Sequence, residues 1–189
     1  MTAELRDTEL RRRIIAEAAE RTARSGWSSV TMSALADRVG VSRQTVYNEV
    51  GSKPALARAM VLHELVHFLA VVDDAFDAHP TDAVAAIRQA VQGILETAQE
   101  DPLVRAILSG ADADLLPLLT SRSGDLLEMA QIATLQRLVP LTPSLEPSRR
   151  AAAVDMVVRT VLSHVTQPSG SPVQVARDVS WAAGRMLSR

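Results

Sequence analysis

The sequence predicts an all-α protein, with a three-helix N-terminal domain that contains a helix-turn-helix and a larger C-terminal helical domain. Apolar residues recur at helical spacing along most of the chain, and no segment shows sustained strand alternation. Pro, Gly and Asp-Pro breaks divide the chain into segments of helical length. With 189 residues and 47% apolar content, the chain can bury the core of one or two small domains.

Residues 31–54 contain the most informative pattern in the chain. One apolar helix face is formed at the spacing i, i+3, i+4 and i+7 by Met32, Leu35, Ala36 and Val39. Gly40 follows, where a helix ends in left-handed backbone, and Val41 then points inward. Ser42 can cap a second helix that runs to about Asn48, with Val46 as its buried anchor. This order predicts a helix-turn-helix.

The exposed face of the second helix is rich in hydrogen-bond donors: Arg43, Gln44, Thr45, Tyr47 and Asn48. Arg can form two hydrogen bonds to guanine and Gln two to adenine, while Thr offers a methyl group to thymine or a hydroxyl to phosphate. The turn pattern alone also fits an ordinary helical hairpin, whose exposed face would more often carry Glu and Lys. The donor-rich face therefore favours double-stranded DNA as a partner, with the second helix in the major groove.

Five short motifs carry a family resemblance: RSGW at 24–27, VTM at 30–32, LADRVGVS at 35–42, TVY at 45–47 and SKPAL at 52–56. At these motifs the chain resembles the TetR family of bacterial transcriptional regulators, over about a quarter of its length. The resemblance implies a ligand-responsive regulator, most often a repressor. It also implies DNA contacts from seven residues, mostly to phosphates: Thr31, Ser42, Arg43, Gln44, Thr45, Tyr47 and Lys53.

One tripeptide departs from the family pattern. Asn48, Glu49 and Val50 stand where the family usually has His or Tyr followed by Phe. Val50 fills less space than Phe, so we expect the core of the small domain to close differently. Glu49 brings negative charge towards phosphates, so we expect weaker general affinity for DNA. The family's DNA contacts therefore do not carry over to residues 48 and 49.

The charge distribution agrees with DNA binding at the N-terminal end. Residues 1–53 contain nine Arg or Lys against seven Asp or Glu, whereas residues 54–189 contain eleven against fifteen. Only the N-terminal part should be attracted to phosphate. The triplet Arg11, Arg12 and Arg13 either adds phosphate contacts or forms a solvated helix start, and the sequence leaves both readings open.

Beyond Pro54 we expect a long helix to about Ala78 and further helices at 82–99, 103–108, 112–120, 124–139, 147–165 and 172–187. Residues 140–147 read as a linker. The expected division is a DNA-binding domain at 1–53 and an effector-binding and dimerisation domain at 54–189.

The two closing helices carry broad apolar stripes. The members are Val154, Val157, Val158, Val161, Leu162 and Val165 on one helix, and Val173, Ala176, Val179, Ala183 and Leu187 on the other. In an isolated chain such stripes would be core. The family resemblance instead implies that the last two helices of each subunit form a four-helix bundle, which predicts a homodimer on a two-fold symmetric operator.

The segment His63-Glu64-Leu65-Val66-His67 matches the H-E-x-x-H signature of zinc proteases, and Asp73 stands where some of these enzymes place a third ligand. The alternative function is therefore a zinc-dependent hydrolase. Against it, Ala70 replaces the Gly at which such chains turn. Three other interpretations remain: His63 or His67 contacts the effector, the pair holds a metal that belongs to the effector chemistry, or both are ordinary helix histidines paired to backbone or carboxylates. We expect no metal and assign His63 and His67 to effector binding.

The sequence contains none of the common motifs of hydrolases, nucleotide-binding proteins or cysteine-based sites, apart from the H-E-x-x-H segment. There are no cysteines, and no nucleophile elbow, phosphate loop or dinucleotide fingerprint is present. The charged residues 1–13 lack the apolar core of a signal peptide, and the apolar stretches read as too short for a membrane helix. We therefore expect a cytoplasmic protein that is not an enzyme, needs no cofactor and does not bind a membrane.

The effector is predicted only by class. Residues 84–139 are rich in Leu, Ala and Val, which favours a lipophilic molecule such as a fatty-acyl compound, a hydrocarbon or a drug. A plain helical core would have the same composition. An effector that binds the DNA-incompetent state more tightly would release a repressor from its operator by tilting the fourth helix.

Overall fold

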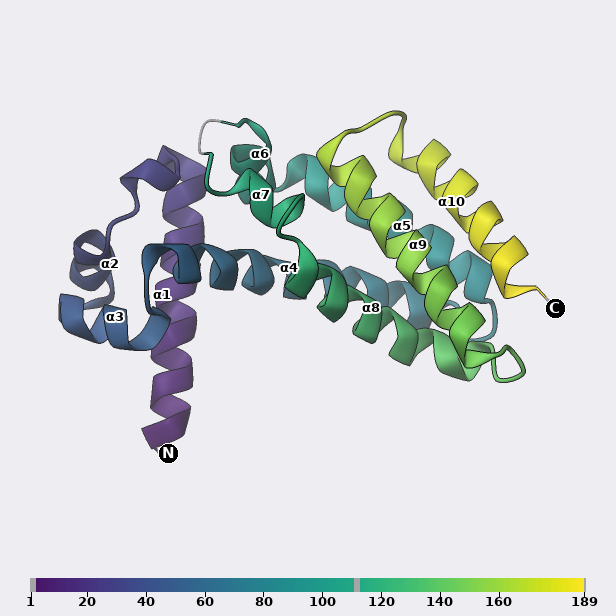
Figure 1. Ribbon diagram of the computed structural model, residues 1–189, viewed down its shortest axis with the longest axis horizontal. Helices are drawn as coiled ribbons and strands as arrows, with labels where there is room; N and C mark the ends of the chain where they lie inside the picture. Colours follow the sequence, from purple (N-terminus) through teal and green to yellow (C-terminus); the bar gives the residue numbers. More distant parts are fainter. Residues whose placement is uncertain (1–2, 111–112, 189) are drawn as a thin grey trace. The chain divides into compact units, whose positions relative to one another are not determined.

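The structure is a computed structural model that describes residues 3–110 and 113–188 (Figure 1). Within these ranges every regular element is a helix, which confirms the predicted all-α class. The chain divides into two compact units. Unit 1 contains Met1–Glu64 and Asp101–Ser121, and unit 2 contains Leu65–Glu100 and Arg122–Arg189. Helix α4 (Lys53–Ala78) contributes residues to both.

Unit 1 is built around the long helix α1 (Ala3–Ser25). The short helix η1 (Trp27–Ser29) follows, and then α2 (Met32–Val39), α3 (Arg43–Val50) and the start of α4. Helices α2, α3 and α6 (Pro102–Leu108) all pack against α1. The side chains that fill this core are fully buried: Ile14, Leu35, Val46, Leu56 and Met60. Val50 is buried as well, so the smaller side chain still closes the domain.

Unit 2 is a helical bundle. It comprises the rest of α4 with α5 (Ala83–Glu100), α8 (Gly124–Leu138), η2 (Val139–Leu141), α9 (Pro147–Thr166) and α10 (Pro172–Leu187). Helix α10 packs against α5 and α9, and α9 packs against α8, as Figure 1 shows. Two glycines allow close helix packing, because a Cβ on Gly93 would lie 2.7 Å from Val71 Cγ1 and one on Gly184 would lie 3.2 Å from Val84 Cγ2.

The apolar stripes predicted on the last two helices mostly lie in or against the core of unit 2, because Val157, Val158, Val165 and Leu187 are partly buried and packed on it. Five of the named residues are buried within unit 2: Val154, Val161, Ala176, Val179 and Ala183. The physical reason is that α10 lies along α5 and α9, so its apolar face is covered by its own chain. Of the stripe residues, Val173 is the one that is largely exposed.

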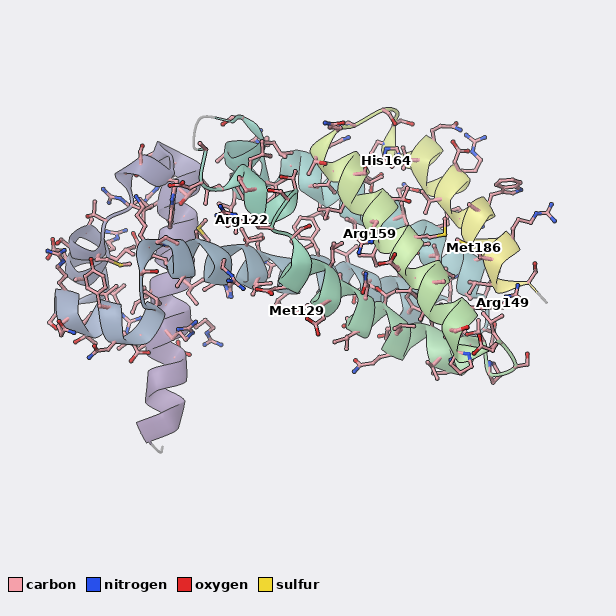
Figure 2. All side chains as sticks on the ribbon, in the orientation of Figure 1. Arg122, Met129, Arg149, Arg159, His164 and Met186 are labelled. Atoms are coloured by element: carbon pink, nitrogen blue, oxygen red, sulfur yellow. The ribbon has the colours of Figure 1, made fainter. Side chains whose placement is uncertain are left out.

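Two neighbouring arginines hold the ends of the last helices. The Arg150 guanidinium is buried and donates to Thr142 Oγ1 at 2.9 Å, to the Thr142 carbonyl at 2.6 Å and to the Leu145 carbonyl at 2.9 Å. It thereby fixes the linker before α9. Arg149 is exposed and donates to the carbonyls of Met186 and Ser188 at 3.4 and 3.2 Å; Figure 2 labels it beside the end of α10.

The predicted helix limits agree with the structure to within one or two residues for all but one helix. The exception is the segment predicted at 112–120, where the structure has α7 (Leu116–Leu119) and where residue 112 lies outside the described residues.

Helix α4 satisfies a length and composition criterion for a membrane span, although charged residues and histidines interrupt its apolar residues. By length and composition alone this 26-residue helix could cross a bilayer. Of its most apolar 18-residue stretch, 28% is buried. A core helix meets the same criterion, so one such helix is weak evidence for a membrane span.

Candidate nucleic-acid interface

Helices α2 and α3 form the predicted helix-turn-helix, and each of its local signals is present. Gly40 has φ +80° and donates its N–H to the Ala36 carbonyl at 2.9 Å, which ends α2. The Thr31 side chain caps α2 by accepting from the Ala34 N–H at 3.1 Å. The Ser42 side chain caps α3 by accepting from the Thr45 N–H at 3.0 Å. The turn geometry is therefore encoded by residues within it.

The caps leave hydroxyl donors available at both helix N-termini. A capping hydroxyl accepts a hydrogen bond and keeps its own proton to donate. Thr45 Oγ1 lies 2.9 Å from Ser42 Oγ, so one of these two hydroxyls donates to the other and the second keeps a free proton. Thr31 and one of the pair Ser42 and Thr45 can thus donate to an acceptor such as a phosphate, in the positive field of a helix N-terminus.

The exposed face of α3 is organised by contacts between residues four apart. The Arg43 guanidinium lies over the Tyr47 ring at 5.5 Å and donates to the Tyr47 hydroxyl at 3.4 Å. Gln44 Nε2 donates to Asn48 Oδ1 at 3.0 Å. Arg43, Gln44, Tyr47 and Asn48 are all exposed, whereas Val46 on the opposite face is fully buried. Helix α3 therefore presents donor-rich side chains to solvent.

Lys53 lies at the start of α4 in a site that the sequence reading missed. Its Nζ donates to the Trp27 carbonyl at 3.0 Å and stands over the Trp27 ring at 4.8 Å. Trp27 itself is buried. The ammonium has three donors, so two remain for a phosphate after the Trp27 contact.

The arginine triplet on α1 is exposed to solvent, and two of its members also contact the helix-turn-helix. Arg11 donates to the Glu49 carbonyl in the last turn of α3, and Arg13 donates to the Val39 carbonyl at the end of α2, at 3.2 Å. Arg12 forms an ion pair with Glu9. Cations at helix C-termini satisfy unpaired carbonyls and favour the helix dipole. Arg11 and Arg13 therefore attach the helix-turn-helix to α1.

The H-E-x-x-H segment lies within the uninterrupted helix α4. His63 is half-buried and His67 is exposed. Asp73 is on the same helix and pairs with Arg137, whose Nε lies 3.6 Å from Asp73 Oδ1. Among the residues that the structure describes, no group of three His, Cys, Asp or Glu side chains could hold a metal ion. The zinc-hydrolase alternative therefore finds no support.

Unit 2 has an open groove of about 410 Å³ along α5. Its lining combines polar side chains with apolar surface and consists of His79, Ala85, Arg88, Gln89, Gln92, Gly93 and Glu96. His79 Nε2 lies 2.8 Å from Gln89 Oε1, and Gln92 donates to Glu96 at 2.9 Å.

Two family profiles match the chain in tandem. Residues 14–60 match the profile described as bacterial regulatory proteins of the tetR family, and residues 82–185 match the C-terminal domain of bacterial tetracyclin repressors. The first match covers α2, α3 and the start of α4, and the second runs from the start of α5 into α10.

Individual relatives agree with the profiles. The HTH-type transcriptional regulator AlkX of Mycobacterium tuberculosis is 30% identical over 155 residues, which are 82% of this chain and 74% of that protein. The crystal structure of the TetR family repressor AlkX from Dietzia sp. strain DQ12-45-1b, implicated in biodegradation of n-alkanes, is 30% identical. It superposes with a TM-score of 0.77 over 93% of this chain and 94% of its own. PfmR from Thermus thermophilus, at 18% identity and a TM-score of 0.52, covers 94% of this chain and 100% of its own and shares the fold.

Proposed function

This chain belongs to the TetR family of bacterial transcriptional regulators, as a ligand-responsive DNA-binding protein and not an enzyme, and we propose that it is a repressor released from its operator by a small lipophilic effector. The observation that carries the proposal is the helix-turn-helix of unit 1, whose exposed α3 face carries Arg43, Gln44, Tyr47 and Asn48. Access to DNA places such a regulator in the cytoplasm.

The repressor assignment and the effector class are supported by the Dietzia relative. That protein is a repressor implicated in n-alkane biodegradation, and its similarity extends over nearly the whole of both chains. The core of unit 2 is almost wholly aliphatic, with Phe76 as its one aromatic member. An aliphatic effector would gain about 0.8 kcal/mol for each methylene buried among such side chains.

Helix α4 couples effector binding to operator binding. This helix is continuous from Lys53, which lies in the DNA-binding unit, to Ala78 in unit 2. Near its C-terminal end it is held to α8, because Arg137 pairs with Asp73 and Asp77 and lies over the Phe76 ring at 6.0 Å. An effector that binds more tightly to the state in which α4 is tilted shifts the protein towards that state and lowers its affinity for the operator. The ratio of the effector's affinities for the two states sets the size of this decrease.

The test is operator release by compounds of graded polarity. The probes are n-alkanes, the fatty acids of the same chain length and their fatty-acyl thioesters, each added to preformed protein–DNA complex. We expect at least one aliphatic series to dissociate the complex, with potency rising with chain length. A series in which only short polar compounds act would contradict the lipophilic class.

His63 and His67 are proposed to contact the effector from α4. Replacing either with Ala should weaken the apparent effector affinity by about tenfold, the value of one hydrogen bond, and leave operator affinity without effector unchanged. His164→Ala is the matched control, because His164 lies on α9 and its Nδ1 contacts Ser169 Oγ at 3.1 Å. Equal effects of all three variants would remove His63 and His67 from the effector site.

The homodimer is proposed to form through the outer surface of α9 and α10, which we define as Met156, Val173 and Trp181. These side chains are 57%, 53% and 65% exposed. Large apolar groups at such exposure, and Trp in particular, are typical of the buried centre of an interface. Arg185 lies over the Trp181 ring at 5.7 Å, so a cation flanks this surface.

The DNA contacts proposed for unit 1 come from Thr31, Ser42, Arg43, Gln44, Thr45, Tyr47 and Lys53. Lys53→Met gives the sharpest test, because Met keeps the stem packed on Trp27 and removes the charge. We expect weaker binding to all duplexes alike and a salt dependence reduced by about one unit of slope. Lys53→Arg is the control and should restore the slope. An unchanged slope in Lys53→Met would remove this residue from the phosphate contacts.

A further inference from the structure

The exposed face of α3 contains two chemically different rows of side chains. Arg43 and Tyr47 form one row, which is cationic and joined by the ring contact at 5.5 Å. Gln44 and Asn48 form the other, which is neutral and joined by an amide hydrogen bond of 3.0 Å. Residues four apart lie on the same face of a helix, so each row runs parallel to the helix axis. The two rows can therefore contact different parts of a DNA groove.

The amide row is suited to base edges rather than to phosphates. Phosphate oxygens only accept hydrogen bonds, so an amide carbonyl has no partner there. Base edges in the major groove present donors and acceptors side by side. The cationic row can satisfy phosphates through the Arg43 guanidinium and the Tyr47 hydroxyl. The chemistry of the two rows thus assigns base reading to Gln44 and Asn48.

The hydrogen bond between the two amides decides which groups remain for the bases. Gln44 uses one N–H of Nε2 on Asn48 Oδ1, and keeps Oε1 as an acceptor and the second N–H as a donor. An acceptor beside a donor matches the N6 amino group and N7 of adenine. Asn48 has its oxygen engaged and keeps two N–H donors. These require an acceptor such as N7 or O6 of guanine or O4 of thymine, and cytosine offers only a donor.

The spacing of the two residues places these contacts within two base pairs of each other. Four residues of α-helix advance about 6 Å, which is within two base-pair steps of about 3.4 Å. In helix-turn-helix proteins the N-terminal residues of the recognition helix reach the bases, and Gln44 is the second residue of α3. Asn48 follows one turn later on the same face.

We propose that Gln44 and Asn48 act as one hydrogen-bonded amide pair that specifies the operator, with Gln44 reading adenine and Asn48 reading a neighbouring base that presents an acceptor in the major groove. Asn48 has two roles in this pair. It contacts its own base through Nδ2, and it orients the Gln44 amide through Oδ1. The inference rests on the proposed function, because it assigns the sequence preference of that same DNA-binding surface.

The experiment starts with selection of binding duplexes from a random pool by the full-length protein. Single-base substitutions in the selected operator then give an affinity penalty for each position. We expect an adenine whose replacement costs about tenfold or more. Substituting 7-deazaadenine, which lacks the N7 acceptor, should weaken binding of the native protein and have no effect on Gln44→Ala.

Two variants of Asn48 separate its direct contact from its orienting role. Asn48→Ala should abolish the affinity penalty for substituting the base that Asn48 contacts. It should also reduce the penalty for substituting the adenine, because Gln44 loses its hydrogen-bond partner. Asn48→Asp keeps an oxygen to accept from Gln44 and removes the amide donors. This variant should retain the affinity penalty at the adenine read by Gln44 and lose only the penalty at the base read by Asn48. Gln174→Ala is the matched control, since Gln174 donates to Asp178 four residues on in α10 at 3.0 Å; every penalty should stay unchanged.

The possible failures are distinguishable. If no duplex is enriched over the pool, sequence-specific binding is absent and the proposed function falls together with this inference. If an operator is selected but Gln44→Ala keeps the full 7-deazaadenine effect, Gln44 does not read that base. If Asn48→Ala leaves every penalty unchanged, the amide pair has no part in specificity while the regulator assignment stands.

Discussion

Helices α2 and α3 differ from helices α9 and α10 in where their structure is encoded. In the first pair the caps and the turn come from residues inside the motif: Thr31, Gly40 and Ser42. In the second pair the environment of each apolar face depends on packing against other helices: α9 packs against α8, and α10 packs against α5, which lies far away in the sequence. Local hydrogen bonds can be recognised in a sequence, whereas the choice between core and exposed surface depends on the tertiary packing.

The largest effect that sharpens this comparison is expected from two adjacent arginines in unit 2. Arg150→Ala should lower the free energy of unfolding by about 3 kcal/mol, because it leaves the part-buried acceptors of Thr142 and the buried carbonyl of Leu145 without their donor. Arg149→Ala, which removes exposed contacts to the end of α10, should cost less than about 1 kcal/mol. Denaturant unfolding of the two variants measures the difference. Equal costs would mean that the linker does not depend on Arg150.

The second expected effect concerns the dimer surface on α9 and α10. Trp181→Ala should weaken the dimer by about 2 kcal/mol or more, or about thirtyfold in the dimer dissociation constant. Sedimentation equilibrium over a dilution series measures this constant. Met129→Ala is the control, because Met129 is also exposed and apolar but lies on α8. A dimer weakened by Met129→Ala and not by Trp181→Ala would move the interface to another helix.

The two regions also differ in how well their roles could be predicted from the sequence. The capping roles at Ser42 and Gly40 were predicted because each depends on neighbours within a few residues. Whether Val154 and Val179 lie in the core or in a dimer interface was left open, because an apolar stripe has the same sequence pattern when its own chain covers it as when a partner does. Trp181 was not singled out, since exposure depends on how α10 packs on α5.

The candidate site shows the same contrast at smaller scale. The residue types on the exposed face of α3 were predicted from spacing alone. The Lys53–Trp27 contact and the roles of Arg11 and Arg13 were missed, because each joins residues at least 26 positions apart. Long side chains that reach across a domain leave no periodic signal in a sequence.

The third prediction separates capping from DNA contact at Ser42. Ser42→Ala should cost about 1 kcal/mol of folding stability, because the Thr45 N–H loses its acceptor. Ser42→Asp keeps a capping oxygen and should retain stability, but its negative charge should strongly weaken DNA binding. Thermal melts and DNA titrations on both variants test this. Unimpaired DNA binding by Ser42→Asp would exclude a phosphate contact at this residue.

The smallest expected effect is a pH dependence at the start of α9. Hydrogen bonds from the Ser148 hydroxyl and from the backbone N–H groups of Ser148 and Arg149 lower the pKa of Glu146 below its ordinary value of 4.5. A lowered folded-state pKa means that the cap contributes fully above pH 4.5 and is lost as the pH falls through the folded-state pKa. The melting temperature of Glu146→Gln should therefore converge with that of the native protein at low pH. A difference that stays constant with pH would contradict this role.

The most direct test of the central claim is a titration of the purified protein against the DNA that flanks its own gene and against an unrelated duplex, at two salt concentrations. A dimeric regulator that reads DNA through α3 predicts tight binding to the flanking DNA alone, with two subunits per site and a salt slope that decreases in Lys53→Met. Equal affinity for both duplexes at both salt concentrations would contradict it, because phosphate attraction alone would then account for the binding.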